Sequence, residues 1–284
     1  MVYPVNLDSI TLSESSLKQK VDTVLDLCCG CGILGIVAST HSKKVTGVDI
    51  NPRAINFSTF NALLNNILNC TFLCGDLYEP LKEEKFDLIL SNPPYEISPY
   101  KTNLFQDGGK DGFKILKKII ESIGAHLTKK GFCQIITKFA ERHNESQQQI
   151  LKTWLHNKNF HIHFLKLYSL SVEETASSIS TDSLRNTGKM DYGEFSSRII
   201  KIMTYFDRIR LAKISFGLIT IKKAPYFHYV EQIFDSSNVL AVELSGKLQY
   251  IIYKHFALSL GFFSILYFLK YFLYKMSRKI FSLK

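Results

Sequence analysis

Short apolar runs alternate with stretches of helical periodicity along most of the chain. Runs of about four to eight apolar residues, bounded by Gly, Pro, Asn or Asp, are typical of strands buried in a parallel sheet. Between these runs, apolar residues recur at helical spacing. The pattern predicts an α/β domain with strands at 22–28, 45–50, 70–74, 86–91, 131–138, 160–170 and within 209–223, and with helices at 33–40, 52–66, 113–127 and 143–157.

Glycines and polar side chains gather where the predicted strands end. Gly30 and Gly32 follow the first strand, Asp49 lies in the second, Asp76 follows the third and Asn92 follows the fourth. The carboxyl ends of parallel strands share one edge of a sheet, where ligands bind, so we expect these residues to form one site. Glycines at such a turn let backbone N–H groups approach a ligand, and an acid ending the second strand typically binds the hydroxyls of a ribose.

The fourth strand runs directly into Asn92-Pro93-Pro94-Tyr95. Two consecutive prolines fix φ near about −65° and end the hydrogen-bonded ladder, so this turn is stiff. It presents an amide oxygen, a backbone carbonyl and an aromatic ring, a set that suits a planar amino group. None of these groups is a strong base, so the turn would position a nitrogen lone pair for attack. An ordinary Asn-Pro-Pro loop is the alternative, which the upstream residues make improbable.

Four stretches, at 24–32, 47–51, 75–77 and 86–95, resemble the class I S-adenosylmethionine-dependent methyltransferases, in the branch that carries an Asn-Pro-Pro-Tyr motif. The resemblance implies a Rossmann-like, seven-stranded, mostly parallel sheet with helices on both faces. The last strand would be antiparallel and lie between strands five and six. It also implies S-adenosylmethionine as cofactor and methyl transfer to a nitrogen. The branch contains adenine methyltransferases of DNA and RNA, guanine methyltransferases of ribosomal RNA, and glutamine methyltransferases of release factors.

The resemblance also assigns roles to individual residues. The glycines would line the methionine end of the cofactor, Asp49 would bind the ribose and Asp76 would meet the adenine. The expected cofactor contacts are Asp26, Cys28, Gly30, Gly32, Asp49, Ile50, Asp76, Leu77 and Asn92, and the expected catalytic residues are Asn92, Pro93 and Tyr95. Cys28 stands where the family has its first loop glycine, which puts the affinity for the cofactor in question.

Two features disagree about the substrate. Glutamine methyltransferases usually carry Glu-x-Gly at the end of strand five, where this chain has Ile-Ile-Thr-Lys at 135–138. In contrast, Gln-Asp-Gly-Gly-Lys-Asp-Gly at 106–112 resembles the loop of those enzymes after the motif. We interpret 96–111 as a substrate lid, with a plain surface connection as the alternative. The substrate stays open between nucleic acid (RNA or DNA), a protein side chain and a small molecule, because the segment 1–20 is short for a reader domain.

Charge and cysteine content give only modest information about the substrate and the cellular compartment. Residues 1–111 carry 9 Lys/Arg and 13 Asp/Glu, a net of −4, whereas residues 112–284 carry 26 and 12, a net of +14. The basic half favours nucleic acid or an anionic membrane surface, with a solvated basic surface as the alternative. Six cysteines without a signal peptide predict a reduced, cytoplasmic protein. The Cys-Cys-Gly-Cys spacing does not fit a zinc site.

The sequence predicts a methyltransferase domain at 1–225 and a hydrophobic, basic, helical tail at 226–284. Residues 246–284 contain seven Lys/Arg and no acid, and they could span a membrane, lie on one, or form a helix that binds protein. Residues 171–198, rich in Ser, Thr, Asp and Glu, are interpreted as a mobile insertion that could touch substrate. A non-catalytic scaffold that keeps the fold is the rival function. The sequence does not predict an oligomeric state.

Overall fold

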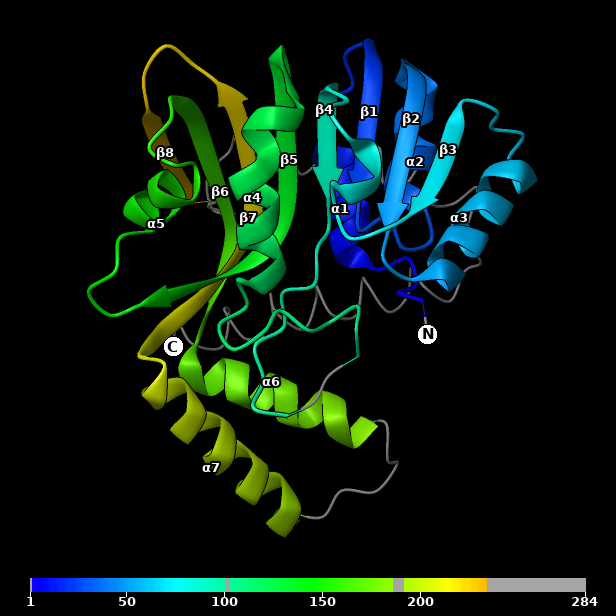
Figure 1. Ribbon diagram of the computed structural model, residues 1–284. Coiled ribbons are helices and arrows are strands. Elements are labelled where there is room, and N and C mark those ends of the chain that lie inside the picture. The colour runs from blue at the N-terminus through cyan, green and yellow to red at the C-terminus, as the bar shows by residue number, and fades with distance from the viewer. Residues whose placement is uncertain (1, 101–102, 186–191, 234–284) are drawn as a thin grey trace, which may run out of the picture. The chain divides into compact units, whose positions relative to one another are not determined.

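The computed structural model describes residues 2–100, 103–185 and 192–233, and these form one eight-stranded sheet (Figure 1). The strands are β1 (Val21–Leu27), β2 (Ser42–Asp49), β3 (Cys70–Cys74), β4 (Phe86–Ser91), β5 (Leu127–Arg142), β6 (Phe160–Ser171), β7 (Leu211–Lys223) and β8 (His228–Ile233). Their order across the sheet is β3-β2-β1-β4-β5-β7-β6-β8. Pairs among β1 to β5 are parallel, and β7 is antiparallel to both β5 and β6. The predicted Rossmann-like fold is confirmed, including the place of the last predicted strand.

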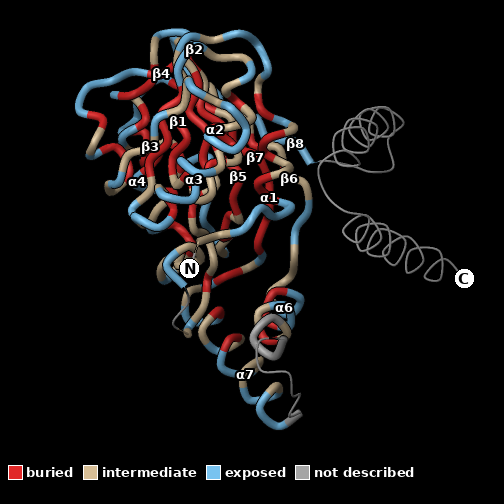
Figure 2. Tube along the Cα trace, turned by 90° about the vertical axis from the view of Figure 1, so that its right-hand side faces the viewer, coloured by how far each residue is buried: buried red, intermediate tan, exposed pale blue. Residues whose placement is uncertain are grey.

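Helices cover both faces of the sheet. They are α1 (Leu7–Ser15), α2 (Ile33–Ala38), α3 (Pro52–Leu64), α4 (Lys114–His126), α5 (Gln147–Trp154), α6 (Val172–Arg185) and α7 (Tyr192–Arg208). One core cluster contains the apolar stripe of α4 and residues of α5, whereas a second contains Leu12 of α1 and Leu34 of α2. Figure 2 shows the buried residues concentrated along the strands between these layers. Packing in the two clusters holds the sheet between its helices. It therefore also holds the carboxyl edge of the parallel strands, where the predicted site lies.

An eighth strand extends the sheet beyond the seven that were predicted. β8 pairs in parallel with β6, from His161↔His228 to Lys166↔Ile233. Its residues were predicted to belong to the tail. His228–Ile233 contains no apolar run, and in the structure it is largely exposed. Edge strands of this kind lack the periodic signal that marks buried strands. The predicted domain boundary at 225 stays a prediction, and the tail from residue 234 onward lies outside the described residues.

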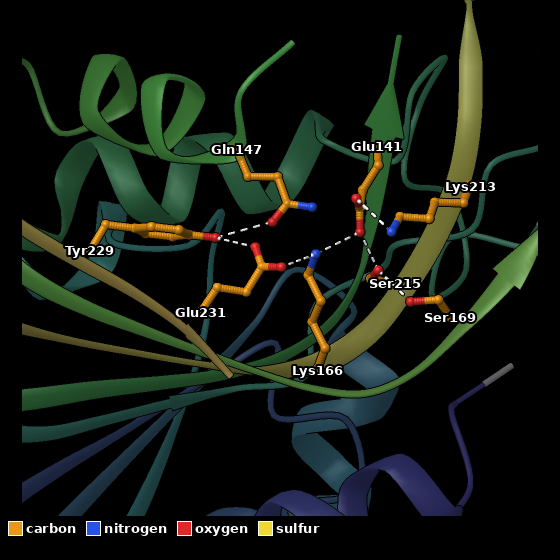
Figure 3. Close-up of polar contacts among 8 residues, drawn as sticks. All are labelled: Glu141, Gln147, Lys166, Ser169, Lys213, Ser215, Tyr229 and Glu231. Atoms are coloured by element: carbon orange, nitrogen blue, oxygen red, sulfur yellow. Dashed lines mark hydrogen bonds and ion pairs between the residues drawn. The ribbon is translucent and has the colours of Figure 1, made fainter. Parts of the chain in front are cut away.

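A buried lysine joins the edge strand to the centre of the sheet. The Nζ atom of Lys166 lies 2.9 Å from Oε1 of Glu141 on β5 and 2.7 Å from Oε1 of Glu231 on β8 (Figure 3). The Lys166 side chain is 4% exposed, whereas Glu141 and Glu231 are 15% and 34% exposed. A buried cation is tolerated only when it is paired, so this network depends on all its members.

Replacing Lys166 by alanine should lower the free energy of unfolding by about 2–4 kcal/mol, because Glu141 would keep its negative charge with little solvent. Denaturant unfolding followed by circular dichroism would measure the change. Lys213→Ala is the matched control, since the Nζ of Lys213 lies 3.4 Å from the same carboxylate but its side chain is 47% exposed. We expect that control to cost less than about 1 kcal/mol. Equal losses in the two variants would contradict the role of burial.

The same network should weaken in acid. Burial would raise the pKa of Glu141, but hydrogen bonds from Ser215 and Lys166 and the nearby charges of Lys166 and Lys213 outweigh burial and lower it. A carboxyl whose pKa is lower in the folded than in the unfolded state stabilises the protein above the ordinary pKa. That stabilisation is lost as the pH falls through the folded-state value.

Most of residues 171–198, the predicted mobile insertion, is helical, and its mobility stays a prediction. They contain α6 and the first part of α7, which contact each other, with residues 186–191 outside the described ranges (Figure 1). Ala176 of α6 and Ile202 and Phe206 of α7 are buried in the larger core cluster. The many Ser and Thr residues dilute the helical apolar pattern of α6, so no helix was predicted there. Because β6 runs parallel to β5, this helical pair stands at the carboxyl edge of the sheet.

Candidate active site

A cavity of about 410 Å³ opens where β1 to β4 end. Its walls come from the turns after these strands, from the N-terminal segment and α1, and from the loop after β4. Nine predicted site residues line it: Cys28, Gly30, Asp49, Ile50, Asp76, Leu77, Asn92, Pro93 and Tyr95. The structure therefore brings the predicted cofactor residues and the predicted catalytic turn into one cavity.

The turn after β1 brings bare backbone to the cavity wall. Gly30 has a φ of +54°, and a Cβ atom added there would have only the carbonyl oxygen of Tyr3 as near as 4.0 Å. Its N–H donates to Oδ2 of Asp49 over 2.9 Å, and the N–H of Asn51 donates to Oδ1 over 2.9 Å. Burial raises the pKa of Asp49, and these two N–H groups oppose the rise. The carboxylate is thus held at the end of β2 by backbone donors on both sides.

Asp26 and Gly32, two predicted cofactor contacts, lie outside the cavity lining. Asp26 is fully buried on β1, and its Oδ2 accepts the N–H of Gly35 over 2.8 Å. Burial raises its pKa to about 7, the Gly35 N–H opposes this and the charge of Asp49 adds to it. Gly32 caps α2 at a φ of +83°, where an added Cβ would lie 2.8 Å from the Cβ of Ser58. Both residues hold the turn and α2 in place behind the cavity wall, and their predicted contact with the cofactor stays a prediction.

The pKa values of the clustered cysteine thiols are raised. Cys28 adopts a φ of 60°, the left-handed region that its family counterpart, glycine, enters without strain. Burial raises the thiol pKa of Cys28, Cys29 and Cys31, with nearby carboxylates adding to the rise. All six cysteines are unpaired. Among the described residues, no group of three or more His, Cys, Asp or Glu side chains could hold a metal ion.

Alkylation should distinguish these thiols from the exposed one. With iodoacetamide at pH 8, we expect Cys74, which is exposed, to react at least about tenfold faster than Cys28 or Cys31, because the thiolate is the reactive form. Peptide mass spectrometry over a time course would give the rates. Fast labelling of Cys28 would mean a thiolate in the cavity and would contradict the buried-thiol description.

Asp76 and Leu77 form the wall after β3. Oδ2 of Asp76 lies 3.1 Å from the Nζ of Lys118 on α4, at a half-exposed ion pair. Leu77 is nearly buried at a φ of 53° and belongs to the larger core cluster. Lys118 also lines the cavity and was not predicted, because nothing in the sequence shows which face of α4 meets Asp76.

The Asn-Pro-Pro-Tyr turn is tied to the N-terminal helix. Nδ2 of Asn92 donates to Oγ of Ser9 over 3.0 Å, and the hydroxyl of Tyr95 donates to Oδ2 of Asp8 over 2.6 Å. The hydroxyl of Tyr3 donates to the same oxygen over 2.8 Å. Tyr3, Asp8 and Ser9 line the cavity and were missed as site residues. No local signal in the sequence marks the contacts of Ser9 with Asn92 and of Asp8 with Tyr95, because each pair is more than eighty residues apart.

The loop after Tyr95 is held at several points. Glu96 and Asp107 form an isolated parallel bridge, and Oε1 of Glu96 lies 2.6 Å from the Nζ of Lys138 on β5. From α7, the guanidinium of Arg198 lies 4.7 Å from the ring centre of Tyr100, and the hydroxyl of Tyr205 donates to the carbonyl of Lys110. Residues 104–107 line the cavity. The interpretation of this loop as a substrate lid stays a prediction.

The residues of the cavity fit S-adenosylmethionine. Two carboxylates, at Asp49 and Asp76, provide acceptors for ribose hydroxyls and an adenine amino group and suit a cationic sulfonium. The open backbone at Gly30 allows a ligand to approach closely. The cavity volume lies within the range of about 300–1,000 Å³ that small-molecule sites usually have.

Comparisons with known proteins agree with the fit of the cavity to S-adenosylmethionine. The sequence model of the methyltransferase small domain family matches residues 9–162, about half of the chain. A protein N5-glutamine methyltransferase inferred in Methanocaldococcus jannaschii is 41% identical over 143 residues, which are 48% of this chain and 71% of that protein. The release factor glutamine methyltransferase of Thermodesulfovibrio yellowstonii is 35% identical over 138 residues, which are 44% of this chain and 50% of that protein. The match thus covers about half the length of this release factor glutamine methyltransferase.

Similar solved structures include a methyltransferase from Pyrococcus furiosus. It is 16% identical, and the match covers 76% of this chain and 82% of that chain with a TM-score of 0.46.

Proposed function

Because this chain belongs to the methyltransferase small domain family, we propose that it methylates the side-chain amide nitrogen of a glutamine in a protein. The family confirms the predicted enzyme class, an S-adenosylmethionine-dependent N-methyltransferase, and it does not favour the rival scaffold function. Both relatives described above are named for glutamine, and one is named for a release factor. They support a protein acceptor over the nucleic acid that the basic half of the chain suggested.

The residues that would hold the cofactor are those at the ends of β1 to β3. Asp49 would accept the ribose hydroxyls, Asp76 the adenine amino group, and the backbone around Gly30 would border the methionine end. When bound, S-adenosylmethionine supplies an electrophilic sulfonium methyl, so that an N–C bond forms as the S–C bond breaks and the acceptor nitrogen gives a proton to water. This chemistry needs alignment more than it needs a base.

The acceptor end of the cavity is the Asn-Pro-Pro-Tyr turn. A carboxamide nitrogen is a poor nucleophile because its lone pair is delocalised into the carbonyl group. The Asn92 side-chain oxygen and the Pro93 carbonyl would accept its two N–H bonds, which orients the nitrogen and places partial negative charge where positive charge develops. The ring of Tyr95 would pack against the planar amide. Lys138 lies 5.4 Å from that ring centre and fixes it from the β5 side.

The observation that carries the proposal is that one cavity contains both the proposed cofactor residues and the proposed acceptor turn. Asp49 and Asn92 line the same space, so a bound cofactor and a planar amide would face each other inside it. Neither a ribose-binding acid nor an Asn-Pro-Pro-Tyr turn alone would support methyl transfer.

The test is transfer from methyl-tritiated S-adenosylmethionine to release factor from the same organism. Label in the protein, with one methylene of added mass on a glutamine peptide, is the expected result. Release factor with that glutamine changed to asparagine is the matched control and should stay unlabelled. Label that appears only in an RNA fraction would contradict the proposal and support the nucleic-acid prediction.

A further inference from the structure

The first turn of α1 reaches the catalytic turn with buried polar side chains. Asp8 and Ser9 are 6% and 4% exposed, and both line the cavity beside Asn92. Oγ of Ser9 accepts from Nδ2 of Asn92 over 3.0 Å, whereas Oδ2 of Asp8 accepts from the hydroxyl of Tyr95 over 2.6 Å. Asp8 and Ser9, adjacent residues of α1, thus contact the side chains of Tyr95 and Asn92, which would bind the acceptor.

This end of α1 is itself firmly placed. The side chain of Asn6 caps the helix by accepting the N–H of Leu7 over 2.8 Å. Leu12 is completely buried in the core cluster that also contains residues of β1, β2 and β4. After the helix, the N–H of Leu17 donates to Oε1 of Gln134 on β5 over 2.8 Å. Capping and packing at both ends make α1 a rigid support rather than a frayed terminus.

The contact with Ser9 decides which end of the Asn92 amide faces the acceptor. The two ends of a carboxamide have nearly the same shape but opposite hydrogen-bonding roles. With the NH2 group committed to Ser9, the oxygen is directed to the opposite side. If the amide turned over, an N–H donor would face the N–H bonds of the acceptor and would repel them.

Asp8 performs the matching task for Tyr95. Its Oδ1 accepts the N–H of Ser9 over 2.7 Å, and its Oδ2 accepts the hydroxyls of Tyr95 and Tyr3. Burial raises the pKa of the Tyr95 hydroxyl, and the charge of Asp8 and its hydrogen bond raise it further. The hydroxyl therefore stays a donor, which fixes the direction of the ring.

We propose that Ser9 and Asp8 are positioning residues that set the orientation of Asn92 and Tyr95 for the acceptor amide. Ser9 holds the Asn92 amide so that its oxygen faces the acceptor nitrogen, and Asp8 fixes the ring of Tyr95. The proposal rests on the proposed function, in which Asn92 accepts from that nitrogen. It adds that α1 orients two side chains of the acceptor site, although the turn after β4 carries those side chains.

Ser9→Ala is the direct test, with Ser13→Ala as its matched control. Ser13 lies on the same helix, is 5% exposed, and its hydroxyl donates only to the carbonyl of Ile10 within the helix. We expect Ser9→Ala to lower kcat for release factor about 10- to 100-fold while the calorimetric Kd for S-adenosylmethionine stays unchanged. Ser9→Thr, which keeps the hydroxyl, should restore most of the rate. A kcat for Ser9→Ala equal to that of Ser13→Ala would overturn the proposal.

A second measurement does not depend on any acceptor. In 15N-labelled protein, the side-chain NH2 signal of Asn92, assigned by its loss in Asn92→Ala, should show one proton that is shifted downfield and exchanges slowly with water. Ser9→Ala should move this signal toward the position of a free amide, and Ser13→Ala should not. If the wild type transfers no methyl group to release factor, the proposed function fails, yet this signal still decides the role of Ser9. An unchanged signal in Ser9→Ala would overturn that role.

Discussion

Replacing Asp49 with alanine should weaken binding of S-adenosylmethionine at least about 100-fold. The reason is that its carboxylate would accept charge-assisted bonds from two ribose hydroxyls, each worth about 1.5–3 kcal/mol. The change would also remove the acceptor that holds the N–H of Gly30 at 2.9 Å, so the turn after β1 would lose a support. Calorimetric titration of the cofactor into purified protein measures the effect directly.

Asp22→Ala is the appropriate control for this loss. Asp22 belongs to β1, the strand beside the one that ends at Asp49, but its side chain is 67% exposed and pairs with Lys43 away from the cavity. We expect that variant to bind the cofactor like the wild type. If Asp49→Ala bound the cofactor with wild-type affinity while it remained folded, the ribose role would be wrong and the cavity would need another assignment.

Asn92→Ala should lower the rate of methyl transfer about 10²- to 10³-fold, the usual loss when one preorganised hydrogen-bond partner of a reacting group is removed. The affinity for the cofactor should change far less than in Asp49→Ala, because the ribose and adenine partners lie on β2 and after β3. Single-turnover transfer to release factor, measured beside calorimetry, separates the two effects.

Asn92→Asp gives a sharper comparison than alanine alone. It keeps an oxygen for the acceptor nitrogen but can no longer donate to Ser9, so we expect a rate between those of the wild type and Asn92→Ala. Full turnover by Asn92→Ala on a substrate that the wild type methylates would refute the role of this side chain.

The cofactor half of the protein was predictable because each element there carries its own local signal. β3 and β4 occupy the predicted residues, and the predicted antiparallel place of β7 is confirmed. Apolar runs bounded by turn residues specify buried strands, and a parallel sheet then gathers their carboxyl ends. Nine of the predicted site residues line one cavity for that reason. Their chemical roles stay predictions until the variants above are measured.

Other elements left no such signal. α1 contributes Asp8 and Ser9 to the site through contacts with residues more than eighty positions away. β8 is an exposed edge strand, and α6 carries so many Ser and Thr residues that its helical pattern is weak. The resemblance implies that Asp26 and Gly32 contact the cofactor, whereas in the structure Asp26 bonds to Gly35 of α2, Gly32 packs against Ser58, and neither lines the cavity. In each case tertiary contacts, not local propensity, decide where the residues lie in the structure.

The position of β7 between β5 and β6 has a consequence for synthesis on the ribosome. β1 to β5 can pair as they emerge, since each one adds to a neighbour that is already made. β6 cannot join them until β7, Leu211–Lys223, has left the exit tunnel, because β7 lies between β6 and β5 and pairs with β5 from Phe132↔Lys222 to Arg142↔Leu211. Until then the long edge of β5 is an open template for other chains. The nascent protein therefore passes through a stage in which chaperone binding matters most, well after its cofactor half is complete.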